Sequence, residues 1–362
     1  MDIFYLKEEN LFNFLKTLES EYEVFVPQKS EGKLRLCPFG FEVSHTEYIL
    51  KEISSVDKEN FSYNPYRTIE PLKSFFISTR EPITEYFESA FEREQKPRVI
   101  FGMKNCDLFS LKIQDFVFLE GVVKDPFYER RRHQNILISS DCFLFKEVCF
   151  CTALGIMPYA QEGFDLNFSE VTSGYIVEVG SEKGAKVIQN NYRYFNPATP
   201  VQIASCNKKR EKFVSNLNQH LILHDLVPKE IIPQIVKEGF NSGVWQELVL
   251  NCVECGGCNF ICDTCHCFLL SDERFGKINE KIRSWDACLY ANFAKVAGGA
   301  NPLRYRYQRL RNRYLKKFDF FVENLGLLAC CGCGRCIEVC PAKIDIREVL
   351  KKLAQQYKTQ KI

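Results

Sequence analysis

The sequence lacks the features that mark several large classes of protein. It contains no uninterrupted stretch of about 18 uncharged apolar residues, so a transmembrane helix is not expected. Asp2 stands where a secretory signal would carry basic residues ahead of an apolar run. The formal net charge is only +2, which argues against general nucleic-acid binding. We therefore expect an ordered cytoplasmic protein whose thiols are kept reduced.

Motifs for nucleotide binding and for nucleophilic catalysis are also missing. The glycine pairs at 180–184 and 298–299 match neither G-x-G-x-x-G nor a Walker motif, and we interpret both as turns. No flavin or nicotinamide site is therefore expected in this chain. The five histidines are spread singly, which gives no support for a Ser-His or Cys-His catalytic arrangement.

Cysteine, in contrast, is abundant, with 18 residues among 362. In a reducing compartment such an excess indicates metal ligation. Eight of these cysteines form two runs of identical spacing, which are Cys252-x2-Cys255-x2-Cys258-x3-Cys262 and Cys330-x2-Cys333-x2-Cys336-x3-Cys340-Pro341. This is the pattern of a ferredoxin with two 4Fe-4S clusters.

In that pattern the fourth cysteine of each run reaches across to the cluster of the other run. The first cluster is thus assigned Cys252, Cys255, Cys258 and Cys340. The second is assigned Cys330, Cys333, Cys336 and Cys262. Glycines between the ligands allow the tight backbone turns that point N–H groups at sulfur. A zinc ribbon is disfavoured because its ligands come as two separated pairs, and a disulfide framework is disfavoured in so long a chain.

A further group of cysteines lies in the first half of the chain, at Cys106, Cys142, Cys149 and Cys151. Four thiols are the full complement for one more 4Fe-4S cluster. Their spacing matches no standard cluster motif, so spacing alone favours the alternative that they are buried free cysteines packed in a core.

The chain is long enough for two or three domains. We expect an α+β protein, in which an α/β-type domain over residues 1–235 precedes an α-helical ferredoxin domain over residues 236–362. In the first domain, hydrophobic periodicity predicts helices at Leu11–Leu18, Ile83–Phe91 and Leu108–Ile113. Strands are predicted at Tyr22–Val26, where Pro27 would end the strand, and at Leu34–Leu36, Ser74–Ile77, Val99–Phe101 and Ile136–Ser139.

The second domain has a helical pattern. Helices are predicted at Ile231–Val236, with Pro233 near the start, and at Val244–Leu250, which leads into Cys252. The long segment between Cys267 and Cys330 is also expected to be helical. Asp345 can cap a last helix, whose apolar stripe contains Ile346, Val349, Leu350 and Leu353.

Basic residues gather in the long segment between the two cysteine runs. They are Arg304, Arg306, Arg309, Arg311, Arg313, Lys316 and Lys317. The simplest interpretation is a solvated helix face. Because a cluster held by four thiolates is negatively charged, we favour compensation of that charge, or docking of a partner, over nucleic-acid binding.

The sequence resembles an iron–sulfur family that includes the beta subunit of sulfhydrogenase and an iron–sulfur subunit of anaerobic sulfite reductase. The resemblance covers most of residues 100–345. In the second half it rests on the first run with Cys265-His266-Cys267-Phe268, on Trp285-Asp286-Ala287-Cys288, on Ala297-Gly298-Gly299 and on Cys330–Cys336. In the first half it rests on Cys106-Asp107, Asp125-x2-Tyr128, Arg131-Arg132, Cys142 and Cys149-Phe150-Cys151.

This resemblance implies an electron-transfer subunit that carries out no substrate chemistry of its own. Its partners would be a flavoprotein that oxidises NAD(P)H and a catalytic subunit, either a nickel–iron hydrogenase or a sirohaem sulfite reductase. The resemblance also implies that Cys106, Cys142, Cys149 and Cys151 lie together and bind a third 4Fe-4S cluster. One departure is Asp263, because the family usually has proline after the fourth cysteine of the first run.

Two other functions remain open from the sequence. The chain could be catalytic, with Cys265, Cys267 and Cys288 forming a reactive dithiol or an extra metal site that handles sulfur compounds. It could instead be a structural or redox-sensing module, although a sensor needs one labile cluster rather than several. Electron transfer between partner proteins is the function we expect.

Overall fold

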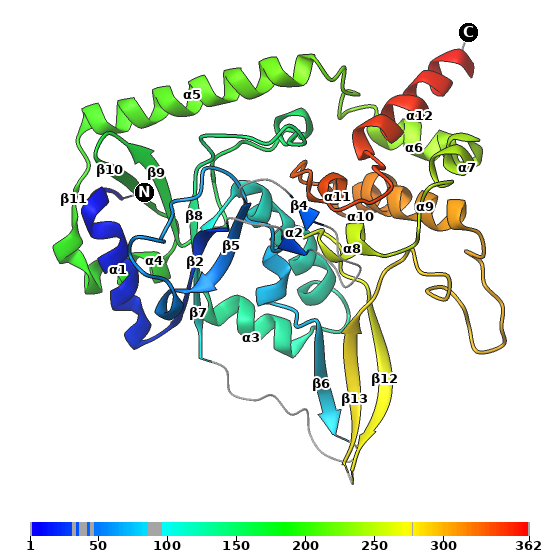
Figure 1. Ribbon diagram of the computed structural model, residues 1–362, viewed down its shortest axis with the longest axis horizontal. Helices are drawn as coiled ribbons and strands as arrows, with labels where there is room; N and C mark the ends of the chain where they lie inside the picture. Colours follow the sequence, from blue (N-terminus) through cyan, green and yellow to red (C-terminus); the bar gives the residue numbers. More distant parts are fainter. Residues whose placement is uncertain are drawn as a thin grey trace.

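The computed structural model describes residues 2–30, 34–35, 42–43, 47–85, 96–276 and 278–360. An eight-stranded mixed sheet forms one half of the molecule, with strand order β11-β1-β10-β9-β8-β7-β2-β5 (Figure 1). Its strands are β1 (Ile3–Lys7), β2 (Glu23–Ser30), β5 (Glu47–Glu52), β7 (Arg98–Met103), β8 (Ile136–Ser140), β9 (Leu166–Val171), β10 (Gly174–Val179) and β11 (Phe195–Pro197). A separate two-stranded pair joins β3 (Leu34–Arg35) to β4 (Glu42–Val43).

The centre of the large sheet is parallel and buried on both faces. Strand β7 pairs in parallel with β2 and with β8, and β8 pairs in parallel with β9. Every residue of β8 is buried, as expected for a central parallel strand. The helices of this half are α1 (Leu11–Thr17), α2 (Asn105–Leu119), α3 (Pro126–Gln134), α4 (Glu182–Asn190) and the long α5 (Pro200–Ile222). The mixture of helices and strands agrees with the α+β prediction.

The second half of the molecule is mainly helical (Figure 1). Its helices are α6 (Ile232–Glu238), α7 (Val244–Leu248), α8 (Gly257–Phe260), α9 (Arg306–Leu315), a π-helix (Lys316–Phe320), α10 (Phe321–Leu325), α11 (Arg335–Glu338) and α12 (Ile346–Gln360). The predicted stripe of α12 is buried in the core. The Asp345 carboxylate accepts a hydrogen bond from the Arg347 backbone N–H at 2.8 Å, as predicted for a helix cap.

A β-hairpin replaces the first part of the segment predicted to be wholly helical. Strands β12 (Phe268–Phe275) and β13 (Ile278–Trp285) are antiparallel, and β13 also pairs with β6 (Arg80–Glu85). The hairpin projects away from the helices (Figure 1). The buried Glu81 carboxylate pairs with Arg283 and with Arg131, so distant parts of the chain fix the hairpin in place. Among the described residues of this segment, helix is found from α9 to α10.

Two other local predictions are wrong, and a third is wrong in the part that the structure describes. Ser74–Ile77 is not a strand, because the backbone after Pro71 turns into a 3-10 helix over Leu72–Phe75. A short apolar run cannot distinguish a strand from a buried turn of helix. Strand β2 continues through Pro27, where it pairs with β5 alone and the missing N–H is tolerated. Residues 83–85 belong to strand β6, and the rest of the predicted Ile83–Phe91 helix lies outside the described residues.

The two halves share apolar contacts. Helix α5 buries Phe213, Leu217 and Leu221 in the core that also contains α6, α9 and α12. Figure 1 shows α5 running from the sheet towards these C-terminal helices. Phe150 and Leu154 belong to the same core. Because of these shared contacts, the division at residue 235 stays a prediction about domain organisation.

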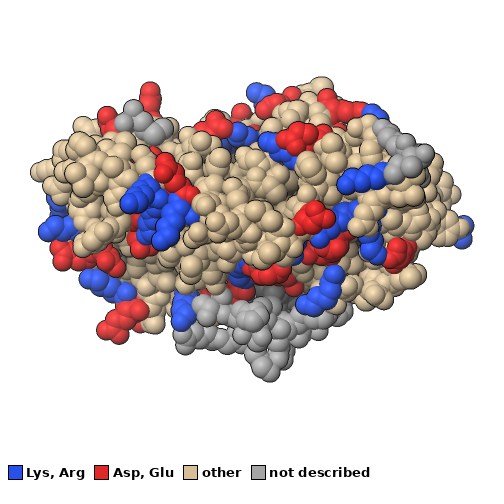
Figure 2. All heavy atoms as spheres, turned by 90° about the horizontal axis from the view of Figure 1, so that it is seen from above, with Lys and Arg blue, Asp and Glu red and all other residues tan. Residues whose placement is uncertain are grey.

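Charged side chains of both signs are interspersed on the face shown in Figure 2, in keeping with the near-neutral sequence.

No helix within the described ranges is both long enough and apolar enough to cross a membrane.

Candidate cysteine-ligated metal centre

The first cysteine run curls around a small cavity. Glu254 and Gly256 adopt left-handed backbone conformations, with φ of 57° and 70°, and the short helix α8 begins directly after Gly256. The turn brings the three closely spaced thiols onto one cavity, which Cys340 of the other run also lines. The remaining walls include apolar side chains such as Leu289, Leu310 and Ile344, and Arg313 and Cys336 also line the cavity. The four cysteines predicted as one ligand set, Cys252, Cys255, Cys258 and Cys340, are thus brought together.

The second run repeats this local geometry. Gly332 and Gly334 are left-handed, with φ of 65° and 73°, and the short helix α11 begins after Gly334 and packs against α8. The thiol of Cys330 lies within electrostatic range of Cys336 and Cys262, and Cys262 in turn is close to Cys333. Cys262 therefore lies beside the thiols of the second run, and its role as the fourth ligand of that cluster stays a prediction.

These groups fit the demands of a cubane cluster. Burial raises the pKa of Cys258 and of Cys330 to about 12. Arg313 opposes the rise at Cys258, and Lys317 opposes it at Cys330. Without metal these two thiols are therefore protonated, and they would lose their protons on binding iron. Among the described residues, no three His, Cys, Asp or Glu side chains converge to hold a single metal ion. The four ligands of a cubane need no such convergence, because each binds a different iron atom.

Buried cations from the basic segment lie beside the thiols. The Arg313 side chain is 4% exposed, interacts with both Cys258 and Cys336, and donates a hydrogen bond to the Cys258 carbonyl. The Lys317 ammonium lies 3.3 Å from the Cys262 sulfur. The pKa of Cys262 is well below its usual value, because the Cys265 thiol donates a hydrogen bond to it and Lys317 is close. Such cations stabilise thiolates in a dry site.

The scattered cysteines of the first half also come together. Cys106 is at the start of α2, Cys142 follows β8, and Cys149 and Cys151 lie on the following loop. Cys142 interacts with Cys106 and Cys149, and Cys151 interacts with both Cys149 and Cys142. Burial raises the pKa of Cys142 to about 12, and the buried Lys104 opposes this. The Lys104 ammonium is held by the Asn64 carbonyl at 2.6 Å and the Ser140 hydroxyl at 2.7 Å.

This third group directly adjoins the second run. The Phe150 backbone N–H donates to the Gly332 carbonyl at 2.8 Å, and Cys333 interacts with both Cys106 and Cys149. A Cβ atom at Gly332 would lie 2.6 Å from the Cys151 backbone, so only glycine allows this approach. The second run thus adjoins both the first run, through Cys336 and Cys258, and the third group.

Arg335 joins these regions in a way that sequence reasoning missed. Its guanidinium, almost fully buried, lies 2.7 Å from the Asp107 carboxylate and 2.7 Å from the Asp263 carboxylate. Burial raises the pKa of Asp263 to about 8, and Arg335 opposes the rise. Asp263 is the position where the resemblance leads one to expect proline. Aspartate in place of proline could have indicated a buried cation nearby, because an acidic residue among buried thiols needs a cationic partner.

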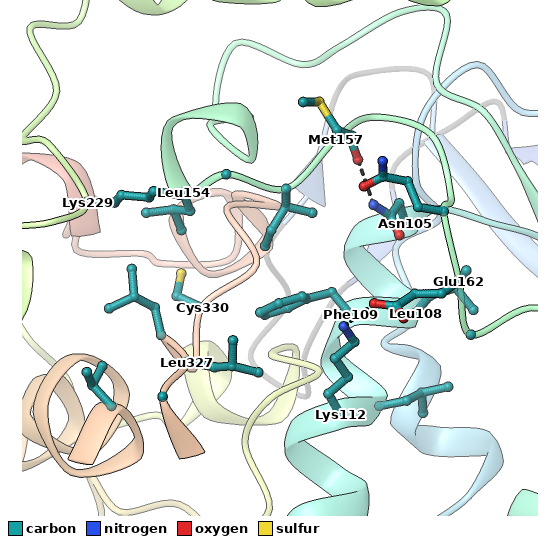
Figure 3. A pocket seen from close by; sticks show the side chains of 18 of the residues that line it. Asn105, Leu108, Phe109, Lys112, Leu154, Met157, Glu162, Lys229, Leu327 and Cys330 are labelled. Atoms are coloured by element: carbon teal, nitrogen blue, oxygen red, sulfur yellow. Dashed lines mark hydrogen bonds and ion pairs between the residues drawn. The ribbon is translucent and has the colours of Figure 1, made fainter. Parts of the chain in front are cut away.

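A separate cavity of about 560 Å³ opens beside Cys330. Figure 3 shows Phe109 of α2 on one side and Cys330 and Leu327 on the other, with Lys112 close to Glu162. The cavity brings solvent near a predicted ligand of the second cluster.

Comparison with known proteins agrees with this geometry. A family model described as a 4Fe-4S dicluster domain matches residues 251–344, so this segment is an iron–sulfur domain of the two-cluster class. Sulfhydrogenase 2 subunit beta of Pyrococcus furiosus is 32% identical over 343 residues, which cover 93% of this chain and 98% of the relative. The chain belongs to the iron–sulfur family of sulfhydrogenase beta subunits. The family predicted from the motifs is confirmed.

Proposed function

We propose that this chain relays electrons between a flavoprotein that oxidises NAD(P)H and a hydrogenase-type catalytic subunit in the cytoplasm. The observation that carries the proposal is the order of the three thiol groups. Cys258 of the first group is an electrostatic neighbour of Cys336 in the second, and Cys333 of the second is a neighbour of Cys106 in the third. These two pairs of neighbours support a line of three groups, which runs from the first through the second to the third.

Each group would hold one 4Fe-4S cluster. The first would use Cys252, Cys255, Cys258 and Cys340, the second Cys330, Cys333, Cys336 and Cys262, and the third Cys106, Cys142, Cys149 and Cys151. When bound, such a cluster accepts and donates one electron at a potential set by its surroundings. The chain contributes the ligands, the apolar walls that exclude water, and buried cations such as Arg313 and Lys317.

No side chain in this proposal makes or breaks a substrate bond. The residues fix the positions of the three groups and their charge environment, so electrons cross by outer-sphere transfer. The similarity to a sulfhydrogenase beta subunit favours a nickel–iron hydrogenase over a sirohaem sulfite reductase as the catalytic partner. The cavity beside Cys330 offers an electron donor or acceptor a close approach to the middle group.

The proposal is tested with the anaerobically purified full chain, which should be brown. NADH or NADPH alone should not reduce it, whereas addition of the flavoprotein should bleach its visible absorption. Cys333→Ser should interrupt the line at its middle, so reduction should reach only the groups on one side. Cys206→Ser is the matched control, because Cys206 is a buried cysteine on α5 that is assigned to none of the three groups. Direct reduction by a nicotinamide would contradict the proposal.

A further inference from the structure

The cavity of the first cysteine group lies beside exposed apolar side chains. Cys252, Cys255 and Cys340 line this cavity and are partly exposed. Val253 also lines it and is 65% exposed, and Leu250, two residues before Cys252, is 69% exposed. Isolated exposed apolar residues are common on protein surfaces, so the surroundings of these two decide whether they have a role.

Basic side chains surround the same cavity. The Arg306 guanidinium donates a hydrogen bond to the Cys252 carbonyl at 2.7 Å. The Arg304 guanidinium lies 5.9 Å from the centre of the Tyr305 ring, and Tyr305 is 55% exposed. Lys343 is exposed, and both of its neighbours in the chain line the cavity. Exposed cations from two separate segments therefore lie around the predicted ligands of the first cluster.

Carboxylates do not neutralise this positive charge. In the part of the chain that the structure describes, neither Arg304 nor Lys343 has an ion-pair partner. Glu254 of the first cysteine run is paired with the buried Arg309, and its carboxylate lies 4.0 Å from Arg306. The site thus combines an apolar contact with a surplus of positive charge. We call it the first-group surface, and it consists of Leu250, Val253, Arg304, Tyr305, Arg306 and Lys343.

Charge decides which occupant fits the first-group surface. Compensation of the cluster charge does not explain Arg304 and Lys343, because solvent screens exposed cations, whereas the buried Arg313 already lies beside the thiols. A second copy of this chain would bring like charges together. The net charge of only +2 disfavours general binding of polyanions. A protein whose carboxylates surround an apolar contact fits both features of the surface.

We propose that the first-group surface docks an acidic redox protein, which exchanges electrons with the first cluster. This inference rests on the proposed relay and deepens it, because it places one end of the relay at the first group and gives the chemistry of the partner's contact face. The partner's carboxylates would face Arg304, Arg306 and Lys343, and an apolar side chain would contact Val253. In each encounter the donor loses one electron and the acceptor gains it, and no bond is made or broken.

The test uses the full, cluster-loaded chain, reduced under anaerobic conditions. Plastocyanin serves as an acidic electron acceptor and cytochrome c as a basic one, and stopped-flow absorption measures the rate of oxidation by each. Added salt should slow the reaction with plastocyanin, because it screens the attraction. At low salt the double variant Arg304→Glu, Lys343→Glu should slow that reaction by about tenfold or more, and should leave the reaction with cytochrome c unchanged or faster.

Two further variants separate the surface from overall charge and from apolar contact. The double variant Lys208→Glu, Lys212→Glu is the matched control, because it changes the net charge equally at two exposed lysines of α5. It should change either rate by no more than about twofold. Val253→Ser should slow the reaction with plastocyanin by about two- to fivefold and leave its salt dependence unchanged.

Iron content and circular dichroism should match the wild type in every variant. If the glutamate variant at 304 and 343 loses iron, the double variant Arg304→Gln, Lys343→Gln replaces it, and should slow the reaction with plastocyanin by about threefold or more. Equal slowing by the control variant would overturn the proposal, because overall charge would then control the rate. A plastocyanin rate that no change at Arg304 and Lys343 affects would also overturn it.

This measurement uses neither NAD(P)H nor the flavoprotein, so its result is distinct from that of the relay test. Failure of the flavoprotein to reduce the chain would contradict the proposed relay, whereas the plastocyanin and cytochrome c rates would still decide whether the first-group surface binds an acidic redox protein.

Discussion

The C-terminal cysteine runs and the N-terminal cysteine group are built in different ways. In each run, three ligands come from one tight turn, whose left-handed glycines at 256, 332 and 334 are encoded within the motif. In the N-terminal group, Cys106 comes from the start of α2, whereas Cys142, Cys149 and Cys151 come from the segment that follows β8. The first kind of site is set by local sequence, whereas the second depends on the fold of the whole half.

This difference predicts that the two kinds of site respond differently to amino-acid substitutions. A local site should survive changes elsewhere in the chain and fail only when its own ligands or glycines are altered. A site assembled from distant loops should also be sensitive to the contacts that place those loops. The contacts around Gly332 and Arg335, where the two kinds of site adjoin, are the most informative places to test this.

The largest expected effect is the loss of a ligand from a local site. Cys336→Ser should lower the iron content by about four atoms per chain and remove one low-potential signal from the electron paramagnetic resonance spectrum. Cys331→Ser is the matched control, because Cys331 is buried in the same run but is assigned to no cluster. Equal iron loss in both variants would show that the run is disrupted as a whole.

A large effect on stability is expected at Arg335. Arg335→Met leaves the Asp107 and Asp263 carboxylates buried without their cation and should cost about 3–5 kcal/mol of unfolding free energy. Lys352→Met, which removes an exposed ion pair with Glu247, should cost at most about 1 kcal/mol. Urea denaturation of both variants measures the contrast. Equal losses of unfolding free energy in the two variants would mean that Arg335 does not stabilise the buried Asp107 and Asp263 carboxylates.

The contact between the two kinds of site is tested at Gly332. Gly332→Ala adds backbone strain and a clash with the Cys151 backbone, whereas Gly326→Ala adds similar strain at φ of 70° with no atom within 4 Å. We expect Gly326→Ala to cost about 1 kcal/mol and Gly332→Ala about 1–3 kcal/mol more. Comparable denaturation midpoints for Gly332→Ala and Gly326→Ala would contradict the close approach of Gly332 to the Cys151 backbone.

The smallest expected effect is a change in potential. Lys317→Met removes a buried positive charge 3.3 Å from the Cys262 sulfur, so the reduced and more negative state of the second cluster should be destabilised. Redox titration should therefore show one potential shifted downward. Lys316 is the neighbouring residue, and it lies near Cys267 and Cys288. Lys316→Met should therefore shift the potential of the second cluster less than Lys317→Met does. An upward shift in Lys317→Met would contradict the electrostatic argument.

The sequence predicted the local features well and the distant ones poorly. The spacing of the cysteine runs indicated how their thiols group, and the periodicity of Ile346, Val349 and Leu353 predicted α12, because both patterns depend on nearby residues. The hairpin that places Cys267 beside Cys288 was missed, since its strands are held by pairing with β6 far away in the chain. Arg335 was missed for the same reason, because its partners come from three separate segments.

The convergence of the N-terminal thiols could be expected only from the family resemblance. Cys106 and Cys142 are separated by α2, α3 and β8, and no local rule relates them. Parallel pairing of β7 with β8 puts the residues that follow both strands at the same sheet edge, which explains why Cys106 and Cys142 meet.

The central claim is that sites of both kinds bind clusters, and iron analysis of the anaerobic full chain tests it most directly. With three clusters the wild type should carry about 12 iron atoms, and Cys149→Ser should carry about 8 with unchanged circular dichroism. A wild-type content near 8 that Cys149→Ser leaves unchanged, in a normally folded protein, would contradict the claim and leave the N-terminal thiols as packing residues.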